Sequence, residues 1–183
     1  MHYRKLGRTD LNVSALCLGT MTWGEQNTEE QGFAQIERAK TAGINFLDTA
    51  EMYPVPPRPE TYAATERVIG NWFKRQGDRA DWILASKIAG PGNGISHIRD
   101  GQLKFNREHI VAALDASLQR LQTDWIDLYQ LHWPERSTNF FGKLGYQHTQ
   151  DHLDTPLQET LQVLDEQVKA GKIRHVGPVS YTH

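Results

Sequence analysis

From Ala15 onward, short apolar runs alternate with longer amphipathic patterns that have helical spacing. Successive parallel strands need a crossover connection, usually a helix, so this alternation predicts an α/β fold with a parallel sheet. Ahead of it, residues 3–6 and 11–13 flank a turn and predict a hairpin. No internal repeat or linker interrupts the pattern, which predicts a single domain over residues 1–183. The runs that we interpret as the parallel strands are residues 15–18, 45–48, 82–87, 128–132 and 173–176.

Four amphipathic patterns between these strands predict helices. The first begins with a capping box, in which Thr28 and Gln31 satisfy free backbone donors, and it ends near Gly43. The second spans residues 64–75, and the third follows Asn106 as its N-cap.

The last helix has explicit signals at both ends. It begins with a second capping box at residues 155–158, places Pro156 at the first helical position and ends at Gly171. The apolar residues that we expect to face the sheet are Leu157, Leu161, Leu164 and Val168.

Charge and composition exclude several classes of partner. Lys and Arg total 20 against 22 for Asp and Glu, so a net charge of −2 provides no basic field for nucleic acid. The chain shows no signal-peptide core and no apolar run long enough to span a membrane. Cys17, the single cysteine, excludes an internal disulfide and is expected in the core of the first strand. We therefore expect a cytoplasmic protein with neither nucleic-acid nor membrane partners.

Four reactive side chains lie at or just after the carboxyl ends of successive expected strands: Asp48, Tyr53, Lys87 and His132. Each alone has an ordinary structural explanation, as a turn residue, a packed ring, a solvated strand end or a hydrogen-bonded imidazole. Their recurrence at one edge favours a site, because catalytic groups of an α/β barrel collect where the βα loops meet.

Together these side chains suit the reduction of a carbonyl group. Hydride attack on a carbonyl carbon leaves an alkoxide, which needs a proton and charge stabilisation. Tyr53 would donate the proton, and a neighbouring Lys87 ammonium would lower the pKa of its phenol. Asp48 would hold Lys87 charged and in place, while His132 would orient the carbonyl oxygen or shuttle the proton.

The sequence resembles the aldo-keto reductase superfamily, whose tetrad is Asp, Tyr, Lys and His in this order. The motifs that carry the resemblance are residues 18–21, 46–53, 85–87, and 117–121 followed by 127–132. Two further stretches, 50–61 and 141–146, are most similar to bacterial Tas-type members.

The resemblance implies a (β/α)₈ TIM barrel that uses NADPH to reduce small aldehydes or ketones, without a Rossmann fold. It also implies that the nicotinamide and ribose lie near Thr20, Met21, Gln26 and Asp48. Ser180 matches a residue that holds the nicotinamide carboxamide, although Tyr181 stands at the neighbouring Asn position and Pro178 removes a ladder donor.

The length predicts an incomplete barrel. TIM barrels typically need about 250 residues, whereas 183 residues provide the hairpin and about four to five βα units. We therefore expect weak NADPH binding or none, and self-association through open barrel edges.

Several other functions remain open or are set aside. Relatives such as the β subunits of potassium channels act as nucleotide-sensing partner proteins, and an inert fragment is a third alternative. His148 and His152 have the spacing of a zinc pair but lack the accompanying Glu, so no metal site is predicted. The loop aromatics Trp23, Trp133, Phe140, Phe141 and Tyr146 are expected either to line an apolar pocket or to cover the barrel mouth.

Overall fold

A five-stranded parallel sheet organises the chain, in the strand order β3-β4-β5-β6-β7. The computed structural model describes residues 1–91, 95–136, 139, 142, 144–148 and 155–179. The strands of the sheet are Leu18–Gly19 (β3), Phe46–Asp48 (β4), Ile83–Ile88 (β5), Ile126–Leu131 (β6) and Ile173–Pro178 (β7). A separate antiparallel hairpin, Tyr3–Lys5 (β1) and Asn12–Ser14 (β2), confirms the prediction for the N-terminal segment.

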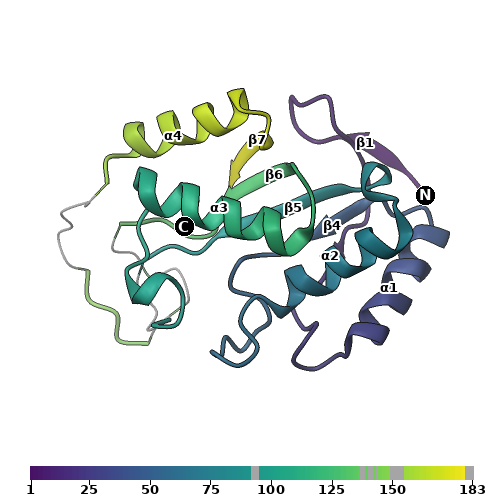
Figure 1. Ribbon diagram of the computed structural model, residues 1–183. Helices are drawn as coiled ribbons and strands as arrows, with labels where there is room; N and C mark the ends of the chain where they lie inside the picture. Colours follow the sequence, from purple (N-terminus) through teal and green to yellow (C-terminus); the bar gives the residue numbers. More distant parts are fainter. Residues whose placement is uncertain (92–94, 137–138, 140–141, 143, 149–154, 180–183) are drawn as a thin grey trace.

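Helices connect the strands and cover one side of the sheet, as Figure 1 shows. They are Glu29–Thr41 (α1), Ala64–Gln76 (α2), Arg107–Leu121 (α3) and Leu157–Lys169 (α4), with short 3₁₀ turns at Arg79–Asp81 (η1) and Arg99–Gly101 (η2). The predicted capping box of α1 is present: the Thr28 hydroxyl accepts from the Gln31 backbone amide, and the Gln31 side-chain oxygen accepts from the Thr28 backbone amide. Asn106 caps α3 in the same way, by accepting from the His109 amide. No helix in the described part of the chain is both long and apolar enough to cross a membrane.

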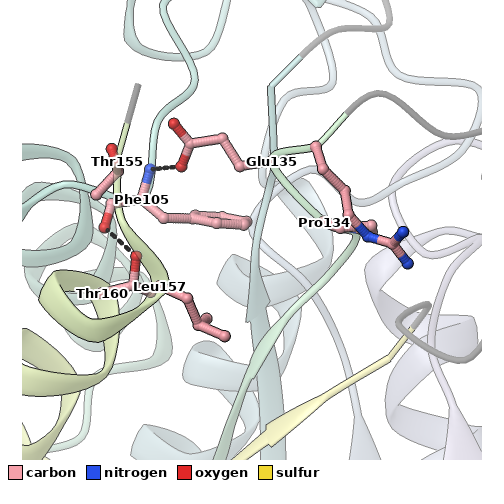
Figure 2. A pocket seen from close by; sticks show the side chains of 7 residues that line it. Phe105, Pro134, Glu135, Thr155, Leu157 and Thr160 are labelled. Atoms are coloured by element: carbon pink, nitrogen blue, oxygen red, sulfur yellow. Dashed lines mark hydrogen bonds between the residues drawn. The ribbon is translucent and has the colours of Figure 1, made fainter. Parts of the chain in front are cut away.

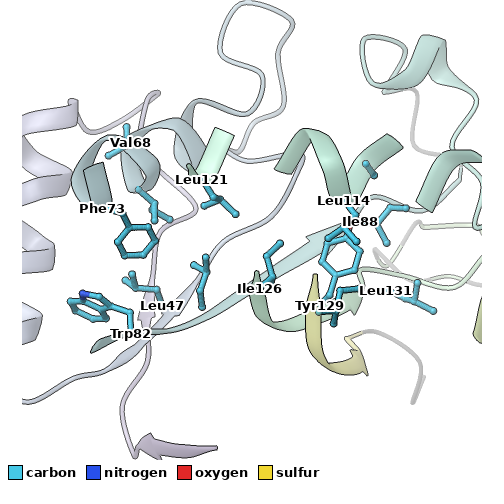
Figure 3. Packing of buried hydrophobic residues seen from close by; sticks show 14 of the residues in the cluster. Leu47, Val68, Phe73, Trp82, Ile88, Leu114, Leu121, Ile126, Tyr129 and Leu131 are labelled. Atoms are coloured by element: carbon cyan, nitrogen blue, oxygen red, sulfur yellow. The ribbon is translucent and has the colours of Figure 1, made fainter. Parts of the chain in front are cut away.

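The main core lies between the sheet and the helices (Figure 3). Side chains that point outward from the strands, such as Leu47, Leu84 and Tyr129, pack there against the apolar faces of the helices. Gly70 of α2 permits a close approach, because a Cβ at this position would lie 2.1 Å from the carbonyl oxygen of Arg120 in α3. A smaller apolar cluster lies around Tyr53 and consists of Ala50, Met52, Tyr53, Ala89, Ile95, Ile98, Leu103 and Trp133.

The start of the sheet differs from the prediction. Strand β3 spans only Leu18–Gly19 rather than residues 15–18, and Cys17, expected in the core, is exposed. Apolar character alone placed this strand too early. The register of the parallel pair, Leu18 with Leu47 and Gly19 with Asp48, defines where pairing begins.

The start of α4 also differs. Pro156 is the N-cap, and no side chain caps the helix, so the predicted capping box at Thr155 is wrong. Leu157 and Leu161 are about half exposed, whereas Thr160, Val163, Leu164 and Gln167 are buried. The buried stripe is rotated because Thr160, rather than a leucine, reaches the neighbouring segment and donates to the carbonyl oxygen of Phe105 at 3.0 Å.

Candidate active site

The four predicted catalytic side chains come together at the carboxyl edge of the sheet. Asp48 ends β4, Lys87 lies near the end of β5, and His132 follows β6 directly. Tyr53 lies in the loop after β4, whose backbone continues along β5: the amide of Thr49 donates to the carbonyl of Ala85 and the amide of Glu51 to that of Lys87. The parallel register and this loop extension therefore gather groups that are far apart in the sequence.

Lys87 is the centre of the arrangement. Its side chain is only 5% exposed, and its Nζ atom donates to Asp48 Oδ2 at 2.7 Å and to the Thr49 carbonyl oxygen at 2.6 Å. The same ammonium lies 3.5 Å from the Tyr53 hydroxyl oxygen and 4.8 Å from the centre of the Tyr53 ring. The ammonium thus bridges the carboxylate and the phenol.

The acid–base properties of Tyr53 differ from the prediction. Burial and, secondly, the negative charge of Asp48 raise the pKa of Tyr53 to about 12, whereas we expected Lys87 to lower it. The reason is that Lys87 is already paired closely with Asp48, while desolvation disfavours the phenolate. Burial also lowers the pKa of Lys87 itself, against the opposing effect of Asp48. Tyr53 is therefore a neutral phenol over the whole neutral pH range.

His132 is a neutral imidazole beside the phenol. Burial, together with the charge of Lys87, lowers its pKa to about 3. Its ring meets the Tyr53 ring edge to face, with centroids 5.8 Å apart, and also contacts the Trp133 ring. The backbone amide of His132 donates to the Ile88 carbonyl. Among the described residues, no hydrogen-bond partner is found for the Nδ1 atom of its side chain.

A cavity of about 510 Å³ opens over Tyr53 and His132. Its remaining lining is apolar and consists of Met21, Met52, Val55, Pro57 and Ile95. Sequence reasoning placed Met21 in the site but missed the other four. Their signal was their position in the loops that follow β4 and β5, where a barrel site is built.

None of the described aromatic residues that we considered for the pocket lining, Trp23, Trp133 and Tyr146, lines this cavity. Trp23 is fully buried in the main core and donates to Gln35, and Trp133 is buried beneath the site and donates to the Pro91 carbonyl. Tyr146 does not line the cavity, and Phe140 and Phe141 lie outside the described residues.

The residues predicted near the cofactor occupy different environments. Thr20 is buried and donates to the Asp48 carbonyl at 2.8 Å, so it supports the strand end. Met21 is 46% exposed at the cavity, whereas Gln26 is exposed and does not line it. Asp48 does not line the cavity, but 31% of its side chain is exposed, so its carboxylate remains accessible to solvent. Ser180 lies outside the described residues, as does His152 of the histidine pair.

A second pocket, of about 130 Å³, lies between the start of α4 and the segment after β6 (Figure 2). Two of its polar groups already bond the backbone, since Glu135 accepts from the Phe105 amide and Thr160 donates to the Phe105 carbonyl. None of the four reactive residues lines it. The candidate site is therefore the cavity over Tyr53.

Comparisons with known proteins show which family the chain resembles. The model of the aldo/keto reductase family matches residues 15–183. The chain is 51% identical over 178 residues to "Protein tas" of Escherichia coli, covering 97% of this chain and 51% of that protein. It is 32% identical to "Aldo-keto reductase yakc [NADP(+)]" of Schizosaccharomyces pombe, covering 95% of this chain and 44% of the relative.

The solved structures show the same relationship. The holo form of the aldo-keto reductase AKR11C1 from Bacillus halodurans superposes with a TM-score of 0.73 at 31% identity, covering 99% of this chain and 51% of that one. The chain thus spans about half the length of the relatives that it matches. Its parallel sheet with helices corresponds to part of their α/β barrel. By sequence and by fold, the chain belongs to the aldo/keto reductase family.

Proposed function

We propose that this chain carries the proton-donating half of an NADPH-dependent reductase of small aldehydes and ketones. The observation that supports the proposal best is the Lys87 ammonium, which contacts both Asp48 and Tyr53 beneath an apolar cavity that His132 also lines.

Tyr53 is the proposed proton donor. A phenol that stays protonated to about pH 12 is available as an acid throughout the neutral range. When a hydride adds to the carbonyl carbon, the carbonyl oxygen becomes an alkoxide and takes the phenolic proton. The tyrosinate that remains lies 3.5 Å from Lys87, whose positive charge stabilises it until solvent returns a proton.

His132 would orient the substrate. A neutral imidazole carries one N–H, which can donate to the carbonyl oxygen without giving up a full proton. Because Tyr53 and His132 share one cavity wall, a single carbonyl oxygen can be held between them.

The cofactor and substrate follow from the surroundings of these groups. NADPH, when bound, supplies the hydride. Exposed Met21 offers an apolar surface to a nicotinamide ring, and the accessible Asp48 carboxylate can accept from a ribose hydroxyl, so the residues present fit this group. NADPH rather than NADH is favoured by the family resemblance and by the NADP(+) in the name of the yeast relative. The apolar cavity favours a small uncharged carbonyl compound.

The partner-protein alternative receives no support from these contacts, since a nucleotide sensor has no need for the assembled proton donor.

The test is a titration of NADPH into the purified chain, followed by its oxidation with a reactive aldehyde, with Tyr53→Phe as control. Saturable binding and turnover that falls about 100-fold or more in Tyr53→Phe would support the proposal. A chimera that joins this chain to the remaining half of the Escherichia coli relative provides a second arm. Absence of Tyr53-dependent turnover in both the chain and the chimera would contradict it.

A further inference from the structure

A buried ion pair anchors the loop that carries the proposed proton donor. Glu51, two residues before Tyr53, is 1% exposed, and its carboxylate contacts the Arg99 guanidinium. The second carboxylate oxygen accepts from the Ala89 amide at 2.9 Å. Neither side chain lines the cavity over Tyr53, so neither touches a substrate placed there.

The pair joins three segments of the chain. Glu51 belongs to the loop after β4, and its own amide donates to the Lys87 carbonyl at 3.0 Å. Arg99 belongs to the loop before α3, and it also donates to the Ala89 carbonyl at 3.1 Å and to Nδ1 of His109 at 3.2 Å. The loop that carries Tyr53, the end of the strand that carries Lys87, and α3 are thereby tied together.

The backbone at Arg99 has an unfavourable conformation. Arg99 and Asp100 both have positive φ values, 43° and 54°, a conformation that residues with a Cβ rarely adopt. Such a conformation persists only where the surrounding structure holds it, and the guanidinium contributes contacts with Glu51, Ala89 and His109. The same loop carries Ile95, which lines the cavity, and Ile98, which packs in the apolar cluster around Tyr53.

We propose that Glu51 and Arg99 are positioning residues, which hold the Tyr53 hydroxyl within reach of Lys87 and fix the Ile95 wall of the cavity. The predicted loss of turnover rests on the proposed function. The predicted change in the position of Tyr53 is independent of it.

A second buried pair provides a matched control. Glu66 is fully buried and Arg120 is 13% exposed, the same value as Arg99, and their side chains meet at 2.7 Å. Glu66 also accepts from the Ser86 hydroxyl at 2.6 Å. This pair joins α2, α3 and β5 on the helix side of the sheet, so its loss should destabilise the fold without moving Tyr53.

The experiment compares Glu51→Gln and the milder Arg99→Lys with Glu66→Gln and Arg120→Lys. A glutamine at 51 turns one carboxylate oxygen into an N–H donor that faces the Arg99 or Ala89 donors. We expect kcat at saturating aldehyde to fall about 10-fold to 100-fold in Glu51→Gln and less in Arg99→Lys, because a shift of about 1 Å in a reacting group has this effect. In the control variants we expect the melting temperature to fall by about as much as in the Glu51 and Arg99 variants, while kcat changes by less than about twofold.

A second readout does not depend on activity. In the chain labelled with fluorotyrosine, the ¹⁹F signal of Tyr53 is the one of six tyrosine signals that Tyr53→Phe removes. Glu51→Gln and Arg99→Lys should shift or broaden this signal, whereas Glu66→Gln should affect Tyr62, whose ring lies under Arg120, and leave Tyr53 unchanged.

The outcomes separate the two proposals. The positioning role would be overturned if Glu51→Gln had the same kcat as Glu66→Gln and the same Tyr53 signal as the unsubstituted chain. If neither the unsubstituted chain nor the chimera shows Tyr53-dependent turnover, the proposed function fails, and the Tyr53 signal alone decides whether Glu51 and Arg99 position it.

Discussion

The Nζ atom of Lys87 lies 2.7 Å from Oδ2 of Asp48, although 39 residues separate them in the chain. Register explains the contact. Asp48 pairs with Ala85 across the parallel strands β4 and β5, and Lys87 lies two residues further on the same face. The lysine side chain therefore points back toward the carboxylate at the end of the neighbouring strand. Its ammonium forms a close ion pair with Asp48 and a longer contact with Tyr53.

The two members of this pair should differ in their effect on stability. Asp48→Asn leaves a lysine that is 5% exposed without its counter-charge, whereas Lys87→Met leaves a carboxylate that is 31% exposed and partly hydrated. We expect the free energy of unfolding to fall by about 3 kcal/mol in Asp48→Asn and by about 1 kcal/mol in Lys87→Met. Urea unfolding at pH 7 measures both, and the reverse order would contradict the prediction.

His132 should make stability depend on pH. The unfolded chain takes up a proton on this residue below pH 6.5, while the folded chain does so only near pH 3, so protons favour unfolding between these values. From pH 7 to pH 5, we expect the chain to lose about 2 kcal/mol more unfolding free energy than His132→Gln does. Parallel stability curves for the two chains over this range would show that His132 titrates normally when folded.

Gly70 should tolerate no side chain. Alanine is favoured over glycine inside a helix by about 1 kcal/mol, but a Cβ at Gly70 would overlap the backbone of Arg120 and Leu121. We expect Gly70→Ala to lower the free energy of unfolding by about 1–3 kcal/mol, as overpacking typically does.

Gly32→Ala is the control for this prediction. The three atoms nearest to its Cβ would be side-chain atoms of Val68 and Trp23, at 3.0 to 3.3 Å, so the overlap is much smaller than the 2.1 Å approach to backbone at Gly70. The prediction fails if both variants are equally stable in urea unfolding.

The edges of the sheet should promote self-association. In the described part of the chain, β3 and β7 each pair with a neighbour on one side only, which leaves backbone donors and acceptors available. We expect the weight-average mass in sedimentation equilibrium to rise with concentration. Lys substitution at Val176, a half-exposed residue of β7, should reduce that rise, and a concentration-independent monomer mass would refute the prediction.

The local elements were predictable because their signals are local. The capping box of α1 and the apolar periodicity act within one or two turns, and α1, α2 and α3 agree with the prediction within a few residues. The exceptions, β3 and the start of α4, are places where a neighbouring segment decides which residues pair or become buried.

The sequence by itself determined the alternation of strands and helices, and hence that Asp48, Lys87 and His132 share one edge, because parallel strands all end on the same side of their sheet. The tertiary structure alone decided the properties of that edge. Burial by distant segments raises the pKa of Tyr53 and lowers that of His132, and the Met52, Val55 and Ile95 side chains shape the cavity. The Glu51–Arg99 pair joins residues 48 positions apart. Desolvation and ion pairing depend on atoms from several segments at once, and no local pattern in the sequence encodes them.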